Sequence, residues 1–398
     1  MSDSRERPPT ALLPFIRRHG MLLIAVVPLL VLFSAFLLFE AAFDDCRTLE
    51  ALGQRLPSIA EAATFCPDPD GKAATAAEGK TAPSVPALAD LSPVIDAGSR
   101  VTWLTAVLLV LFVTLPALGF TWWSLWKYAG WPQFRVVALL ALAIFAGWLF
   151  VWQPAIGEPP RLETGRPSGF PALLLIHQHM TADLLHAVDP AFHGFAYRLY
   201  MICFGLLVFS VVSGLFAAGY TLSPLKEAER RNANALAQRM QDVKHFLYLG
   251  ALLLTVAIIF TAAWLRWPVN LLPPDTALHK DLSALVNSVI MFWGAIYSAI
   301  LLSAYLPGAL CLRARARGLA ARSLGQAGDS EPGASKGSPD EAEGTREPPS
   351  EKEIEKYLKD NRLLLPLADQ LQRVLAIFAP AMAGPLISAI GALNQIPG

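Results

Sequence analysis

The chain has 398 residues, of which 54% are hydrophobic and only 16% are charged. A soluble domain carries about a quarter charged residues, so this composition argues against an ordinary soluble protein. Lys+Arg and Asp+Glu are balanced at 32 each, and the net charge therefore gives no support for a nucleic-acid partner.

Six apolar runs are long enough to cross a hydrocarbon core of about 30 Å, which takes about 20 residues of helix. None of them contains Asp, Glu, Lys, Arg or His. The sequence predicts an all-α membrane protein, with a bundle of about six transmembrane helices within residues 21–323. The predicted spans are 21–39, 103–123, 136–152, 199–220, 246–265 and 284–305.

The distribution of Lys and Arg predicts the orientation of this bundle. With the N-terminus inside, the inner segments are richer in Lys and Arg than the outer ones, as the positive-inside rule requires. The Ala-, Arg- and Pro-rich composition is typical of a high-GC bacterium. We therefore predict a bacterial inner-membrane protein with its N-terminus (1–20) and C-terminal tail in the cytoplasm. The outer segments are then 40–102, 154–198 and 266–282.

Two features of the predicted outer side follow from this orientation. Cys46 and Cys66 share an outer segment, where an oxidising periplasm favours a disulfide between them. Such a bond would stabilise the fold by about 3 kcal/mol in the chain-entropy model. Trp103, Trp264 and Trp267 are placed at the outer membrane interface, where amphipathic rings are common.

On the inner side, the last two predicted spans continue as helical extensions. Ser223 and Pro224 are typical of a helix start, and the helix from there is expected to run into span 246–265. Span 284–305 is expected to continue through Leu312, Ala316, Leu319 and Ala320. Arg313, Arg315, Arg317 and Arg322 surround that extension; they either set the topology only or also meet anionic lipid headgroups.

The C-terminal region is the most unusual part of the chain. Residues 324–350 hold almost no large apolar side chain, which predicts a disordered linker. A charged helix is predicted at 351–360, and an amphipathic helix begins at Pro366. Pro380 and the pair Gly384–Pro385 are expected to interrupt that second helix. Its apolar face comprises Leu367, Leu371, Val374, Leu375 and Phe378, opposite Asp369, Gln370, Gln372 and Arg373.

Three interpretations of this tail (351–398) remain open. It can lie in the membrane interface. It can bind another protein, or another copy of the chain, through its apolar face. Alternatively, residues 374–393 form a seventh span, since they contain no charged side chain.

A histidine-rich stretch in the second outer segment is the candidate metal site. On a helix starting near Pro171, His179, Asp183 and His186 share one face. Two imidazoles and a carboxylate can ligate zinc or another divalent metal. The competing interpretations are a solvated helix face and a pH sensor.

The sequence contains no recognisable catalytic motif and no cofactor signature. The most polar site within a span is Asn287 with Ser288, and Asn287 is expected to bond a neighbouring helix. The leading hypothesis is a non-enzymatic, self-associating channel or membrane-signalling component whose C-terminal tail docks on the membrane or on a protein partner. The alternatives are a membrane enzyme or metal-handling protein built on the His/Asp cluster, and a transporter.

Overall fold

The computed structural model describes four main parts of the chain, together with short helical stretches between residues 27 and 38 and between 134 and 146. The main parts are 93–129, 190–222, 232–327 and 350–393, the last with gaps at 362 and 364–366. All the regular secondary structure in these described residues is helical.

Four of the described helices are long and apolar enough to cross a membrane. Each contains one predicted span, which confirms the membrane class and four of the predicted helices. The predicted count of six stays a prediction, because residues 21–39 and 136–152 are described only in part. The four helices are α4 (Pro93–Ala129), α7 (Pro190–Thr221), α8 (Ala233–Asn270) and α9 (Ala277–Ala327).

Two of these helices begin earlier than predicted. The sequence assigned the residues before 103 and before 199 to outer loops, but α4 starts at Pro93 and α7 at Pro190. Proline suits the first helical position, because its fixed φ matches the helix and its missing N–H would have no intrahelical partner there. The hydropathy of a span marks its apolar centre and does not reveal these polar first turns.

The predicted helical extensions of the last two spans are present. Asn232 caps α8, its side-chain oxygen accepting from the amides of Asn234 and Ala235 at 3.0 and 3.4 Å. The proposed start at Ser223–Pro224 lies outside the described residues. α9 continues without interruption to Ala327, and the four apolar residues expected on its extension are all buried: Leu312, Ala316, Leu319 and Ala320.

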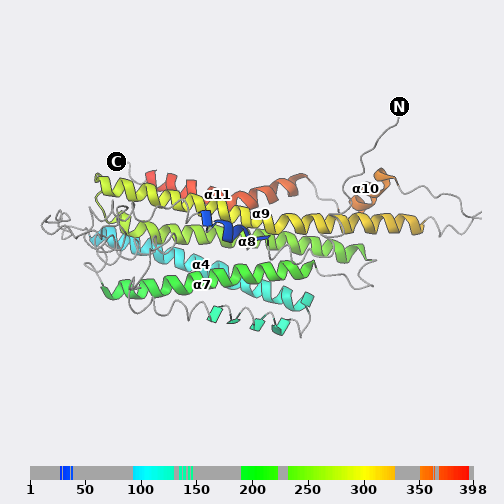
Figure 1. Cartoon of the computed structure of the whole chain (residues 1–398), viewed down its shortest axis with the longest axis horizontal. Coiled ribbons are helices and arrows are strands. Elements are labelled where there is room, and N and C mark those ends of the chain that lie inside the picture. Colours follow the sequence, from blue (N-terminus) through cyan, green and yellow to red (C-terminus); the bar gives the residue numbers. More distant parts are fainter. Residues whose placement is uncertain are drawn as a thin grey trace, which may run out of the picture.

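The long helices run side by side along one axis of the molecule (Figure 1). One end, which we call the aromatic end, holds the start of α9 and the rings of Trp103, Trp264 and Trp267. The opposite end, which we call the polar end, holds Arg239 and Asp242 of α8. α9 extends beyond α8 at the polar end, and α10 lies beside that extension (Figure 1).

The tryptophans expected at the outer membrane interface are buried in the core at the aromatic end. Trp103, Trp264 and Trp267 are each at most 2% exposed. The ring of Trp103 stacks on that of Trp267 at 5.6 Å, and Tyr200 stacks on Trp264 at 4.8 Å. Neighbouring helices therefore supply aromatic partners that cover these three residues, and their position at the outer membrane interface stays a prediction.

The C-terminal region forms two further helices. α10 (Glu351–Asp360) has the predicted bounds and starts with a capping box between Ser350 and Glu353. α11 (Leu367–Leu393) is one helix and passes through both Pro380 and Pro385. The predicted interruptions at these prolines were therefore wrong.

Candidate functional site: the groove that holds the C-terminal helix

α11 lies in a groove between α8 and α9 and runs antiparallel to α9 (Figure 1). The order of contacts along α9 shows this direction: Tyr305 meets Arg373, Ser298 meets Ala381, and Ile290 lies beside Gly384. α11 therefore starts near the polar end and advances toward the aromatic end. Ala383 belongs to the same buried cluster as Trp264 and Trp267.

Glycines allow α11 to approach α9 at backbone distance. A Cβ atom placed on Gly294 would lie 2.9 Å from the carbonyl oxygen of Pro380 and 3.3 Å from the Cα of Ala381. A Cβ on Gly384 would lie 3.3 Å from the side chain of Ile290. Small residues at such crossings are typical of helix pairs in membranes, where close van der Waals packing drives association.

Pro380, at the centre of this crossing, also leaves a backbone amide of α11 in need of a hydrogen-bond acceptor. A proline in a helix interior displaces the preceding turn and weakens the backbone hydrogen bonds around it. At Pro380 the next amide, that of Ala381, donates to the hydroxyl of Ser298 on α9 at 3.1 Å. A neighbouring Ser side chain is one of the ways in which membrane-embedded helices tolerate proline.

Two polar contacts hold the first turns of α11. Lys244 of α8 donates to the carboxylate of Asp369 at 2.9 Å. This hydrogen bond, aided by the charge of the lysine, lowers the pKa of Asp369 below its ordinary value. One turn later, the guanidinium of Arg373 donates to the hydroxyl of Tyr305 on α9, and the Arg373 side chain is buried.

The face of α11 that meets the bundle differs from the one expected from the sequence. Arg373, Ile377 and Ala383 are buried on the bundle side. The predicted apolar face points away from the bundle, and the predicted polar side supplies the contacts of Asp369 and Arg373. The exposed members of that apolar face are Leu371, Val374, Leu375 and Phe378; the side chain of Leu367 lies outside the described residues.

α10 docks on the extension of α9 through a small apolar cluster. Leu358 of α10 and Leu363 beyond it are buried with Leu236, Leu312 and Ala316 of α8 and α9. The hydroxyl of Tyr357 donates to that of Ser323 at 3.2 Å. The two C-terminal helices thus contact α8 and α9 at the polar end and α11 continues along the bundle.

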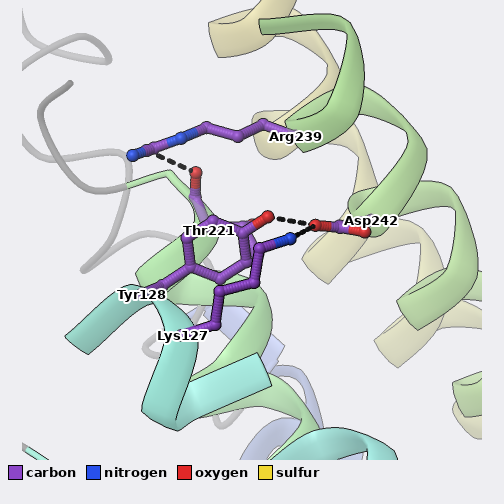
Figure 2. A network of polar contacts seen from close by, with 5 residues as sticks. All are labelled: Lys127, Tyr128, Thr221, Arg239 and Asp242. Atoms are coloured by element: carbon purple, nitrogen blue, oxygen red, sulfur yellow. Dashed lines mark hydrogen bonds and ion pairs between the residues drawn. The ribbon is translucent and has the colours of Figure 1, made fainter. Parts of the chain in front are cut away.

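A polar network joins three helices at the polar end (Figure 2). Asp242 of α8 accepts hydrogen bonds from the hydroxyl of Tyr128 and, at 3.2 Å, from the ammonium group of Lys127, both on α4. Arg239 of α8 donates to the carbonyl of Thr221, the last residue of α7, at 3.0 Å. Arg239 and Asp242 are at most 9% exposed, so these contacts satisfy charges that would be costly to bury alone.

Arg239 of α8 and Arg315 of α9 donate hydrogen bonds to the backbone carbonyls at the end of α7. The last carbonyls of a helix have no intrahelical donors. Arg239 donates to the carbonyl of Thr221, and the guanidinium of Arg315 donates to the next carbonyl, that of Leu222, at 2.6 Å. Arg315 was expected to surround the extension of α9; in the structure it links that extension to α7.

The polar pair predicted within the last span is present, and its two residues behave differently. Asn287 accepts a hydrogen bond from the guanidinium of Arg266 on α8 at 2.7 Å, which confirms the expectation that it bonds a neighbouring helix. Ser288 is exposed and donates to the carbonyl of Ala284 in its own helix at 2.9 Å.

The other predicted site residues lie outside the described residues. These are the disulfide pair Cys46 and Cys66 and the metal candidates His179, Asp183 and His186. Among the residues that the structure describes, no cluster of three His, Cys, Asp or Glu side chains could hold a metal ion. The disulfide and the divalent-metal site therefore stay predictions.

Sequence reasoning missed the residues that build the groove. Gly294, Ser298 and Gly384 carry no charge and match no catalytic pattern. A signal was nevertheless available, since Gly294 and Ser298 form a small-xxx-small pair of the kind found at membrane helix contacts. Gly384 and Pro380 were interpreted only as helix breakers.

No protein-family model, no curated protein and no solved structure matches this chain. The proposed function is therefore argued from the geometry alone.

Proposed function

We propose that this chain is a non-enzymatic integral membrane protein in which docking of the C-terminal helices regulates the transmembrane bundle. The main observation behind this proposal is the position of α11. It packs in the groove between α8 and α9, and Gly294 of α9 lies where the two helix backbones come closest. α10 and α11 follow a segment of low apolar content, so their contacts with the bundle join parts of the chain that are distant in sequence.

The seat of α11 supports a membrane-embedded position for this helix. It packs against the apolar middles of α8 and α9, and its other face exposes Leu375, Phe378, Met382 and Leu386. Exposed apolar side chains on a helix at this depth suit contact with lipid. We therefore favour the seventh-span interpretation of 374–393 over a helix in the membrane interface.

This position has a consequence for the proposed topology. The predicted orientation places the polar end in the cytoplasm, where Lys127, Arg239 and Arg313 agree with the positive-inside rule. In that orientation α10 is cytoplasmic and α11 crosses toward the outer side. The expectation of an entirely cytoplasmic tail is then replaced by one in which only its first helix stays inside.

Within this class, a membrane-signalling component or a channel formed by self-association is supported best. The described helices pack an aromatic core at one end, so a conducting pathway would have to form between copies of the chain. The exposed apolar faces of the helices, including Leu108 and Phe112 of α4, are available for such contacts or for lipid.

The test compares ion flux through liposomes containing the full chain with flux through a chain that ends at Ala327. We expect removal of α10 and α11 to change the flux, because it empties the groove. A Gly294→Leu variant of the full chain should reproduce that change, whereas Gly318→Leu on the same helix should not, since nothing lies within 4 Å of a Cβ there. If none of these proteins conducts ions after verified insertion, the channel is rejected. The proposal then reduces to a membrane-signalling component.

A further inference from the structure

A pocket opens at the polar end where α8, α9, α10 and α11 meet. It has a volume of about 480 Å³, within the usual range for ligand sites. Its lining changes character along α9. Leu306 and Leu310 come first and are about half exposed, and Arg313 and Arg317 follow.

These four residues form one stripe, because their spacings of four, three and four residues repeat the helical period. The predicted span of α9 ends at residue 305, so the leucines lie at the border of the hydrocarbon and the arginines one to two turns beyond it. The stripe therefore offers an apolar surface followed by a cationic one, in the order of an acyl chain and a headgroup.

Arg373 supplies the second, independent observation. It lines the same pocket from α11 and is only 6% exposed. One of its nitrogens donates to the hydroxyl of Tyr305, but its Nε has no hydrogen-bond partner. Asp369, one turn earlier on α11, forms its ion pair with Lys244 and acts on Arg373 only through its charge, without a hydrogen bond between the two. A buried guanidinium in this state has a donor still to satisfy, and an anion would supply the acceptor and balance the charge at once.

The charge of the lining selects the kind of lipid. Glu351 and Glu355 of α10 also line the pocket, opposite the three arginines, which leaves a formal excess of one positive charge. A single phosphodiester balances that excess. A zwitterionic headgroup leaves it uncompensated.

We propose that this pocket binds one anionic phospholipid of the cytoplasmic leaflet. The phosphate is held by Arg373 together with Arg313 and Arg317, through charge-assisted hydrogen bonds. The part of an acyl chain next to the headgroup lies along Leu306 and Leu310 of α9 and Val374 of α11. Because the pocket exists only while α10 and α11 are docked, the lipid joins the C-terminal helices to the bundle. This inference depends on the docked helices and is independent of ion conduction.

The test is native mass spectrometry of the purified full chain, titrated with phosphatidylglycerol and with phosphatidylcholine of the same acyl chains. We expect the first phosphatidylglycerol to bind at least tenfold more tightly than phosphatidylcholine. The double variant Arg313→Gln/Arg317→Gln should lose roughly tenfold in affinity for phosphatidylglycerol and keep its affinity for phosphatidylcholine. Both arginines are exposed, so this variant tests the site without disturbing the fold.

Two controls make the result specific. Arg322→Gln should bind like the parent, because Arg322 bonds the carbonyl of Gly318 on its own helix and does not line the pocket. Millimolar inorganic phosphate should not displace the lipid. Equal affinity for the two lipids, an unaffected double variant, or displacement by inorganic phosphate would each overturn the proposal; the last would assign the site to a free anion.

Discussion

The amide of Ala381 donates a hydrogen bond to the hydroxyl of Ser298, 83 residues earlier in the chain. The bond occurs one residue after a proline, where the helix of Ala381 is least able to satisfy its own backbone. It therefore ties the irregular point of α11 to a fixed point on α9. Gly294, one turn from Ser298, removes the side chain that would hold the two helices apart.

Replacing Ser298 with alanine tests the hydrogen bond. The variant leaves the amide of Ala381 without its acceptor, and we expect a loss of about 1 kcal/mol in the docking of α11. Hydrogen–deuterium exchange of residues 374–386 in lipid nanodiscs measures this as faster exchange. Ser288→Ala is the matched control on the same helix, since Ser288 bonds only its own helix. Equal exchange in the two variants would show that the bond contributes nothing.

Adding one methyl group at Gly294 tests the close approach. The new Cβ of Gly294→Ala would meet the backbone of Pro380 at 2.9 Å, and backbone cannot move aside as a side chain can. We expect a destabilisation of about 1–3 kcal/mol, as for other overpacked contacts. The unfolding midpoint in detergent measures it. Gly318→Ala, on the same helix with open space around it, should be neutral or slightly stabilising.

The contact between Lys244 and Asp369 predicts a dependence of docking on pH. The docked helix has a lowered Asp369 pKa, so the contact stabilises docking above the ordinary value near 3.8 and loses this effect as the pH falls through the lowered pKa. The protection factors of residues 369–386, which compare exchange with its intrinsic rate at each pH, should therefore fall at the acidic end of the range, below about pH 4. In Asp369→Asn this acid-dependent step should disappear, and its persistence would assign the step to another group.

Asp242 is predicted to be the most sensitive residue of the polar network. In Asp242→Asn the ammonium of Lys127 and the hydroxyl of Tyr128 lose a charged acceptor, which we expect to cost about 2 kcal/mol. The free energy of unfolding in a mild detergent would report this change. Asp275→Asn, an exposed position in the turn between α8 and α9, should leave the stability unchanged. A similar loss in both variants would refute a special role for Asp242.

Hydropathy predicted the spans well because it depends on local composition alone. All four described spans lie where the sequence placed them, and the burial of Leu312 and Ala316 follows from their helical spacing. The same local reasoning could not find the partners of those helices. Trp264 was placed from its residue type alone, and the sequence did not reveal that Trp103 and Tyr200 pack against its ring.

The C-terminal tail shows even more clearly that local sequence patterns do not reveal the partners of a helix. Pro380 was expected to end a helix, since proline removes a backbone donor and crowds the preceding turn. The helix continues because Ser298 and Gly294, far away in the sequence, accommodate the irregular turn. Arg373 was assigned to the side opposite the apolar face, and only the fold reveals that Tyr305 lies within its reach.

The central claim, that α11 is seated in the groove of α8 and α9 within the membrane, is tested by a disulfide across the deepest contact. Ile290→Cys and Gly384→Cys are introduced into a full chain whose four native cysteines are replaced, with a protease site between residues 328 and 349. Oxidation in native membranes, followed by cleavage, should leave the C-terminal fragment attached until a reductant is added. Ile290→Cys paired with Leu386→Cys, an exposed position on the same helix, should release it. Release of the fragment from the first pair, with both cysteines shown to be reactive, would contradict the docked helix.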